Sequence, residues 1–485
     1  MGLFFLNKTE VFAFVALKCE HQSSTMIKRI LLVLMPAVLF IQPQIRAQDT
    51  VRVNLTEFIQ RGLEKSGQVA YQRGAVDLAE NRSDQVRSQR FLPSFQLSTQ
   101  HGVVPGVNSP LGLPDSQLYL DPNLENDWEN WAVFTRAEVR AVQPVFSWGA
   151  ITKAIEAAEA GAKAAQHQFS AARSEAEIQL YDLYYSFLLV KEIQVILDDA
   201  SEQITRVEEQ IEEMREEGNP DLEESDVFKF EIYRSEFEIR RKEVEESAAR
   251  VRRVWEYILG DENNEVFRPA QQFLDPVPFE LEAYSYYQQM AMNERAELKG
   301  VEYGIDALQK TSEAVRSQQY PLLFMGLSGS YANTPNRPRQ TNPFIINSTN
   351  YASAAVGFGI RQNLNFGSMK ASVEKADIEY RRVRDLKKAL TDGIVLELTE
   401  SYQEAVVADE RVKRTDEALV TARNWVRNEQ LNYDIGFGDV ENLLEAVQKE
   451  LELRVELKQN VFDFNKKVAA LYKASGIPIY QLSTN

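Results

Sequence analysis

The sequence predicts a mainly α-helical chain that contributes four strands to a membrane β-barrel. Three observations predict this fold class: very long helical stretches with heptad spacing, four strands of alternating polarity, and one order of patterns that occurs twice. The 485 residues are 44% hydrophobic and 26% charged, as in ordinary folded proteins.

The N-terminal residues are predicted to be a targeting segment outside the fold. A short basic start, an apolar run and the small residue Ala47 form a secretory signal peptide at 26–47. The apolar run is shorter than the roughly 20 residues that a membrane helix needs. Met26 is a second candidate start, which would make residues 1–25 a mis-called extension. Cleavage after Ala47 would remove Cys19, the only cysteine, as suits an exported bacterial protein without disulfides.

Two repeats, 48–274 and 275–485, account for the order of the remaining patterns. A helix gives way to a strand at Pro93 and again at Pro321, 228 residues later. Each repeat is expected to hold a first helix, two strands and a long helical hairpin. The expected strands are about 94–104, 131–146, 322–331 and 352–364, and the expected hairpins are 149–259 and 367–473.

Hydrophobic residues in the hairpins follow a heptad spacing, which predicts coiled-coil seams. A helix of about 67 residues forms a rod of roughly 100 Å, far longer than a globular helix. Breaks near Gly218 and Gly436 would turn the chain. The seam positions are Ile193, Leu197, Ala200, Ile204, Val207, Ile211 and Met214; Phe230, Phe237, Val244, Val251 and Ile258; and Val461, Phe464, Val468 and Leu471.

Each strand places apolar side chains on one face and polar side chains on the other; Phe95 and Leu97, for example, alternate with Gln96 and Ser98. Ten-residue strands with this alternation are typical of a transmembrane β-barrel. A soluble half-buried sheet would alternate in the same way, but the signal peptide favours the membrane. Four strands cannot close a barrel, and an open edge in lipid leaves backbone groups unpaired. Twelve strands from three chains would enclose an aqueous lumen.

Composition and motifs argue against other classes of function. The formal charge of −18 disfavours a nucleic acid partner. The single cysteine and the three scattered histidines lack metal-ligand spacing, and no H-E-x-x-H, P-loop or G-x-S-x-G motif is present. We therefore expect a protein that is not an enzyme, with no catalytic residue, cofactor or metal.

Over essentially the whole mature chain, the duplicated order of helices and strands resembles that of the TolC-like outer-membrane efflux proteins. The resemblance depends on the duplication and on the order of three motifs, Phe-Leu-Pro at 91–93, Gln-Pro-Val-Phe at 143–146 and Tyr-Asp-Ile-Gly at 433–436. It implies a homotrimer with a 12-stranded barrel in the bacterial outer membrane and a long α-helical barrel in the periplasm. It also implies the exit duct of a tripartite efflux or type I secretion system, passively exporting small molecules or proteins. Its partners would be a periplasmic adaptor (membrane fusion) protein, an inner-membrane pump and outer-membrane lipid.

The resemblance further implies a gate at the second hairpin tip, where the family uses a tyrosine, an arginine and acidic residues. Tyr433 matches the tyrosine and Glu445 the second acidic position, whereas Asn442 and Gly438 replace the first acid and the arginine. Candidate substitutes are Asp434 and Asp439, for which solvated helix-end carboxylates are the alternative interpretation.

The two hairpin tips are the expected docking sites for an adaptor. They comprise Gly218, Asn219 and Pro220 in the first hairpin, and Ile435, Gly436, Phe437 and Gly438 in the second. The alternative function is that of a soluble periplasmic coiled-coil scaffold or an adaptor protein.

Overall fold

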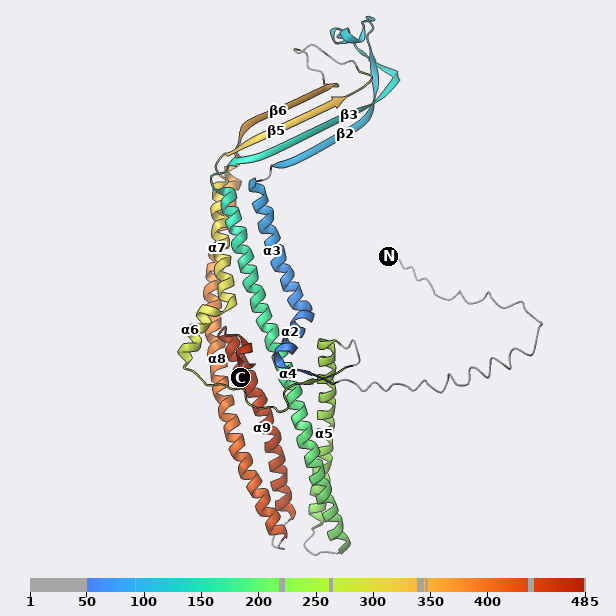
Figure 1. The fold of residues 1–485 in the computed structure, drawn as a ribbon. Helices are drawn as coiled ribbons and strands as arrows, with labels where there is room; N and C mark the ends of the chain where they lie inside the picture. Colours follow the sequence, from blue (N-terminus) through green and yellow to red (C-terminus); the bar gives the residue numbers. More distant parts are fainter. Residues whose placement is uncertain are drawn as a thin grey trace, which may run out of the picture.

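The computed structural model describes residues 50–91, 93–217, 223–260, 265–337, 344, 348–434 and 440–483. The chain is mostly helical, and an antiparallel sheet lies at one end of a long helical trunk (Figure 1). The predicted signal peptide and the tip residues 218–220 and 435–439 lie outside the described residues. Within the described ranges, no helix combines the length and apolar content needed to cross a membrane.

Four helices exceed 30 residues in the described part of the chain and give the trunk its length. At 68 and 69 residues, α4 and α8 each extend for roughly 100 Å. The helices are α2 (Leu55–Lys65), α3 (Gly67–Phe91), α4 (Ala150–Glu217), α5 (Glu224–Leu259), α6 (Tyr284–Glu294), α7 (Ala296–Ser317), α8 (Phe366–Asp434) and α9 (Val440–Ala474), with 3-10 helices η2 (Asp115–Leu120) and η3 (Ile479–Ser483).

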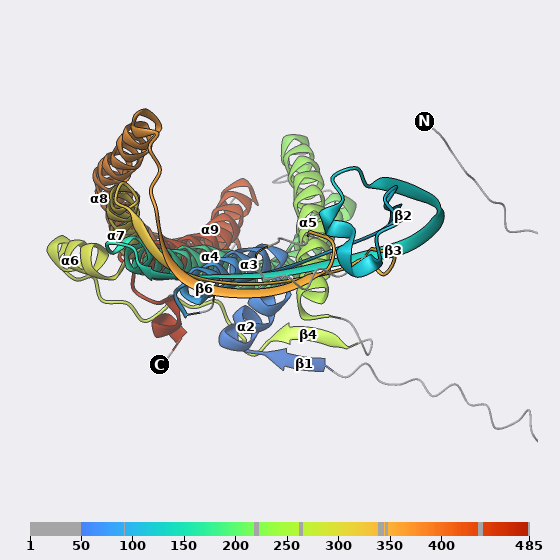
Figure 2. The same cartoon turned by 90° about the horizontal axis from the view of Figure 1, so that it is seen from above.

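The larger sheet is antiparallel, with strand order β2-β3-β5-β6, and it is curved when seen from above (Figure 2). A register shift between Pro105 and Gly106 interrupts the β2–β3 pairing, and both strands continue beyond it. The strands are β2 (Ser94–Asn108), β3 (Glu125–Phe146), β5 (Leu322–Asn333) and β6 (Tyr351–Arg361). Since the order ends at β2 and β6, each of these strands has one edge without a partner strand among the described residues.

A second, two-stranded sheet lies beside the trunk. Its strands β1 (Thr50–Val53) and β4 (Val266–Pro269) are parallel, although more than 200 residues separate them. The sequence does not predict this sheet, because strands of four residues are too short to show a period. Val53 and Phe267 are buried, so the sheet joins the start of the described chain to the trunk core.

The main core lies where α2 meets α4, α5 and α9. Trp255 of α5 is fully buried, and its ring stacks on Phe58 of α2 with centroids 4.3 Å apart. Asn54 caps α2 by accepting a hydrogen bond from the Glu57 N–H at 2.8 Å, which fixes where this helix begins.

The predicted coiled-coil seam of the first hairpin is confirmed by burial. Ile193, Leu197, Ala200, Ile204 and Ile211 of α4 are all buried. They form one apolar cluster with two seam residues of α5, Phe230 and Phe237, against which side chains of α9 also pack. The two long hairpins therefore share a core along their lower halves.

Candidate functional site

The larger sheet has one apolar and one polar face, and its register aligns each kind of side chain across all four strands. The apolar face has exposed side chains over much of its area; Val356 is 71% exposed. One apolar row contains Phe95, Ala141, Leu327 and Val356. The adjacent row on the other face contains Gln96, Arg140, Ser328 and Ala355. The alternation predicted from the sequence is thus a property of the whole sheet.

Aromatic side chains gather at both ends of this sheet. At the trunk end, the Trp148 indole N–H donates to the Pro321 carbonyl at 2.8 Å and its ring lies 5.3 Å from Tyr320. At the far end, the Trp131 indole N–H donates to the Trp128 carbonyl at 2.8 Å. Indole and phenol rings favour a boundary between an apolar phase and water.

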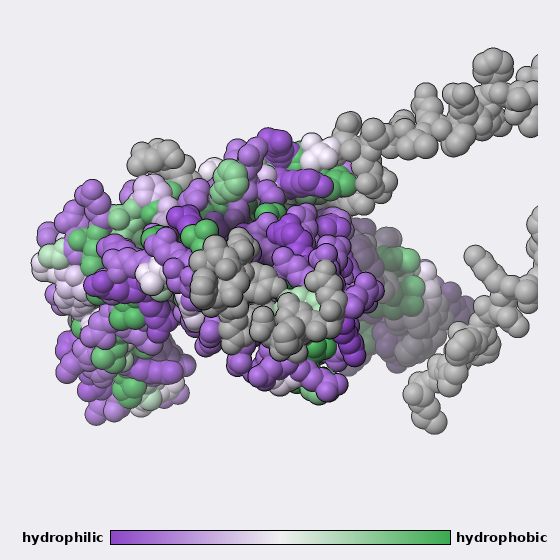
Figure 3. All heavy atoms as spheres, turned by 90° about the horizontal axis from the view of Figure 1, so that it is seen from below, coloured by the Kyte–Doolittle hydropathy of each residue, from purple (hydrophilic) through white to green (hydrophobic). Residues whose placement is uncertain are grey.

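The lower end of the trunk holds the predicted gate. Tyr433 and Asp434 lie in the last turn of α8, and Asn442 and Glu445 lie in the first turns of α9, where both are exposed. Asp439 lies outside the described residues, as do the predicted tip residues 218–220 and 435–438. Seen from below, this end of the molecule is predominantly hydrophilic, with small scattered hydrophobic patches (Figure 3).

Ion pairs that could not be predicted from the sequence connect the two hairpins. Near the lower end, the ammonium of Lys229 on α5 lies 2.6 Å from the carboxylate of Glu441 on α9. The hydrogen bond between these two groups is the main cause of the raised pKa of Lys229. Farther up, bases of α9 meet acids of α4 in antiparallel order. These pairs are Arg454 with Asp199 at 2.6 Å, Lys458 with Glu192 at 3.0 Å, Lys466 with Asp182 at 3.2 Å, and Lys473 with Glu175.

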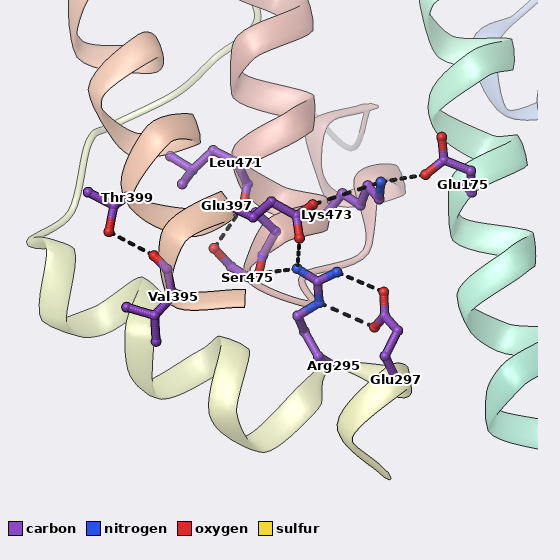
Figure 4. A network of polar contacts seen from close by, with 10 residues as sticks. Glu175, Arg295, Glu297, Val395, Glu397, Thr399, Leu471, Lys473 and Ser475 are labelled. Carbon is purple, nitrogen blue, oxygen red and sulfur yellow. Dashed lines mark hydrogen bonds and ion pairs between the residues drawn. The ribbon is translucent and has the colours of Figure 1, made fainter. Parts of the chain in front are cut away.

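A buried arginine lies where α6, α7, α8 and α9 meet (Figure 4). Arg295, at the start of α7, is only 5% exposed and contacts the Glu297 carboxylate at 2.7 Å. Its guanidinium also donates to Glu397 of α8 at 2.5 Å and to the Ala474 carbonyl at 3.3 Å. Lys473 lies between Glu397 and Glu175 of α4, so the network extends across the trunk (Figure 4).

Gly476 lets the end of α9 approach this arginine. Its φ is +72°, and a Cβ there would lie 2.9 Å from the Arg295 backbone nitrogen. Both features restrict the position to glycine. Ser475, fully buried beside it, donates from its hydroxyl to the Leu471 carbonyl at 2.7 Å. The network therefore joins the end of one hairpin to the start of α7.

Replacing Arg295 with methionine should lower the free energy of unfolding by about 1–3 kcal/mol, because two carboxylates and a carbonyl lose charge-assisted hydrogen bonds. The matched control is Arg414→Met: Arg414 also pairs with two carboxylates but is 69% exposed, so solvent screening should leave little or no loss of stability. Apparent melting temperatures of both variants measure the difference. Equal decreases in melting temperature would show that the burial of Arg295 does not increase its contribution to stability.

The stability lost in Arg295→Met, relative to the parent protein, should depend on pH. Burial is the largest single influence and raises the pKa of Glu297, but the hydrogen bond and charge of Arg295, a backbone hydrogen bond and the charge of Lys473 together outweigh it and lower the pKa below its ordinary value. A carboxyl group whose pKa is lower in the folded than in the unfolded chain stabilises the folded state. This contribution is complete at pH values above the ordinary pKa, about 4.3, and it is lost as the pH falls through the lowered pKa. The stability gap between the parent and Arg295→Met should thus narrow below about pH 4.

Comparisons with known proteins show similarity in structure. No family model and no curated protein matches the sequence. The outer membrane protein VceC of Vibrio cholerae is 16% identical, with a TM-score of 0.66 over 87% of this chain and 96% of that chain. The open MtrE outer membrane channel of Neisseria gonorrhoeae is 14% identical, with a TM-score of 0.68 over 87% and 89%.

A third channel gives the same result. The CmeC outer membrane channel of Campylobacter jejuni is 12% identical, with a TM-score of 0.68 over 87% of this chain and 85% of that chain. Each comparison thus spans the trunk and the sheet together. The chain is therefore similar in fold to the TolC-like outer-membrane efflux channels, which confirms the resemblance found in its sequence.

Proposed function

We propose that this chain forms the outer-membrane exit duct of a tripartite efflux or type I secretion system. The observation that carries the proposal is the four-stranded sheet, whose apolar face is exposed and whose two edge strands lack partners among the described residues. An exposed apolar face of this extent favours lipid, and unpaired edges in lipid are costly. Three copies would pair β6 of one chain with β2 of the next and close a barrel of twelve strands.

The height of the sheet fits a bilayer. Tyr331, near the far end, lies eleven positions after Tyr320 at the trunk end. A strand of that length, tilted by about 40°, spans about 28 Å along the membrane normal, close to the apolar band of about 25 Å in outer-membrane barrels. The aromatic side chains at both ends of the sheet would then lie at the two interfaces.

Helix α5 supports the association of three chains. Phe228, Ile232 and Ile239 recur at helical spacing and are each more than half exposed. A neighbouring copy packed against this stripe would bury it and would continue the ring of helices below the barrel. We also propose that 48–274 and 275–485 are the two repeats of the chain, since each contains helices, two strands of the larger sheet and a long helical hairpin in the same order.

We propose the lower end of the trunk as the regulated opening. Tyr433, Asp434, Asp439, Asn442 and Glu445 would narrow the lumen there, and the two hairpin tips would receive a periplasmic adaptor. The adaptor would connect the duct to an inner-membrane pump. The role proposed for the chain itself is passive conduction.

Removing polar groups from the proposed gate should increase the conductance of the channel. The double variant Tyr433→Phe with Glu445→Ala removes a hydroxyl and a carboxylate in each chain, and each exposed polar tie contributes only about 0–1 kcal/mol. Three copies act together in the trimer, so single-channel conductance in planar bilayers should rise. Glu456→Ala, also exposed on α9 but eleven residues farther from the tip, is the control and should leave conductance unchanged. Unchanged conductance in the double variant would place the constriction elsewhere.

Reconstitution tests the proposed function against the scaffold alternative. A duct should stay in the outer-membrane fraction after a high-salt wash and should produce discrete conductance steps in planar bilayers. A soluble periplasmic scaffold or adaptor would be released by the wash and would give no steps. That second result would refute the proposal.

A further inference from the structure

A cationic hollow lies on the trunk where the two-stranded sheet meets α4 and α5. Its volume is about 560 Å³, within the range of sites for small organic ligands. Arg52, Lys191, Arg252 and Arg268 line it, and none of the described residues that line it carries a carboxylate. In a chain with a formal charge of −18, four cations around one hollow form a local reversal of charge.

Two of these arginines are direct neighbours across the small sheet. Arg52 of β1 pairs in register with Arg268 of β4, and both are exposed. Adjacent strands lie about 4.8 Å apart, and like charges directly opposite each other destabilise a sheet. The buried residues Val53 and Phe267 hold this register, because they place the opposite face of the sheet in the core. An anion between the two guanidinium groups would relieve the repulsion.

The carboxylate next to Lys191 in the chain does not neutralise the hollow. Glu192, next to Lys191 in the chain, turns to Lys458 of α9 at 3.0 Å. Within the described residues, Arg52, Arg252 and Arg268 make no side-chain hydrogen bond or ion pair. Their guanidinium groups are therefore available to a ligand, whereas the Lys191 ammonium donates to the Gln272 carbonyl at 2.9 Å.

Apart from Gln194 and Gln272, the remaining side chains that line the hollow are apolar, and they favour a ligand with a hydrophobic body. Phe187 and Val190 of α4, Val251 of α5 and Phe273 after β4 all line the hollow. Guanidinium groups bind oxyanions with bidentate, charge-assisted hydrogen bonds, and an aromatic ring or alkyl chain can cover the apolar surface. The combination selects amphipathic anions over inorganic ions or neutral apolar compounds.

We propose that this hollow is a binding site for an amphipathic oxyanion, a carboxylate or phosphate group on an apolar body. Arg52 and Arg268 bind the oxyanion, Arg252 adds to the positive field, and the apolar side chains of α4 and α5 contact the body. This site is separate from the proposed lumen and gate, and it does not depend on the proposed export function.

Calorimetric titration of the full-length protein in lipid nanodiscs tests this proposal, with empty nanodiscs as the blank. The probes are 2-naphthoate, 2-naphthyl phosphate and the neutral 2-naphthamide. Both anions should bind saturably, one per chain, and the amide at least tenfold more weakly. The phosphate ester should bind more tightly than the carboxylate, because it carries the larger charge. Equal binding of 2-naphthoate and the amide, or no saturable binding of either anion, would overturn the proposal.

Variants then assign the binding to these residues. The double variant Arg52→Gln with Arg268→Gln should weaken 2-naphthoate binding at least tenfold, and Arg252→Gln alone should weaken it severalfold. Arg253→Gln is the matched control, because Arg253 is exposed on α5 next to Arg252 but does not line the hollow. Should the double variant fail to assemble, the comparison of Arg252→Gln with Arg253→Gln decides. Equal losses in those two variants would refute the site.

Discussion

Replacing Val356 with arginine is expected to prevent assembly in the outer membrane, whereas Ala355→Arg is expected to permit it. The two residues are neighbours on β6 with opposite orientations: Val356 belongs to the apolar row with Leu327, and Ala355 to the polar row with Ser328. An arginine facing lipid near the bilayer midplane costs about 2–4 kcal/mol, so three copies would cost about 6–12 kcal/mol in a trimer. An arginine facing an aqueous lumen avoids this desolvation.

The amount of heat-modifiable oligomer in purified outer membranes measures this difference. We expect the Val356→Arg oligomer to be absent or strongly reduced and the Ala355→Arg oligomer to be near the parent level. Equal amounts for the two variants would mean that the apolar face does not contact lipid.

Replacing Trp255 with alanine is expected to lower the free energy of unfolding by about 3–5 kcal/mol, the usual cost of removing a buried large aromatic side chain. Trp255 is fully buried, stacks on Phe58 and lies 4.7 Å from the ring of Phe187. Its indole N–H also donates to the Leu183 carbonyl at 3.4 Å. The variant loses this packing at the point where α2, α4 and α5 meet.

The control for this prediction lies two residues farther along α5. Tyr257 is 77% exposed, and its ring contacts the Lys65 ammonium at 5.7 Å. Tyr257→Ala should therefore cost no more than about 1 kcal/mol. Apparent melting temperatures of the reconstituted variants compare the two. A small loss of stability for Trp255→Ala would contradict this prediction and would show that the main core relaxes around the cavity.

Periodic features of this fold could be predicted from the sequence, because each is local. The heptad seam at Ile193 and Leu197 recurs every seven residues, and the alternation at Phe95 and Leu97 recurs every two. Both periods report which face of an element is apolar. Beyond residue 104 this signal ends for β2, since the register shifts between Pro105 and Gly106 and only Val107 and Asn108 follow in the strand.

Interactions between distant residues could not be predicted in this way. Arg295 contacts Glu397 and Ala474 across 102 and 179 positions of sequence. Nothing in the neighbourhood of Arg295 indicates that it is buried. The pairs between α4 and α9 left a weak signal, acids on one helix and bases on the other at roughly helical repeats, but only the packing of the hairpins makes them partners. The four-residue strand that places Arg52 beside Arg268 left no signal at all.

Native mass spectrometry of the purified protein in detergent tests the central claim most directly, because one chain supplies four strands and a closed duct requires shared strands. We predict a dominant species of three chains, which dissociates only under conditions that also remove the β-sheet signal in circular dichroism. A folded monomer that retains its full sheet signal would contradict the proposal that three chains close one barrel.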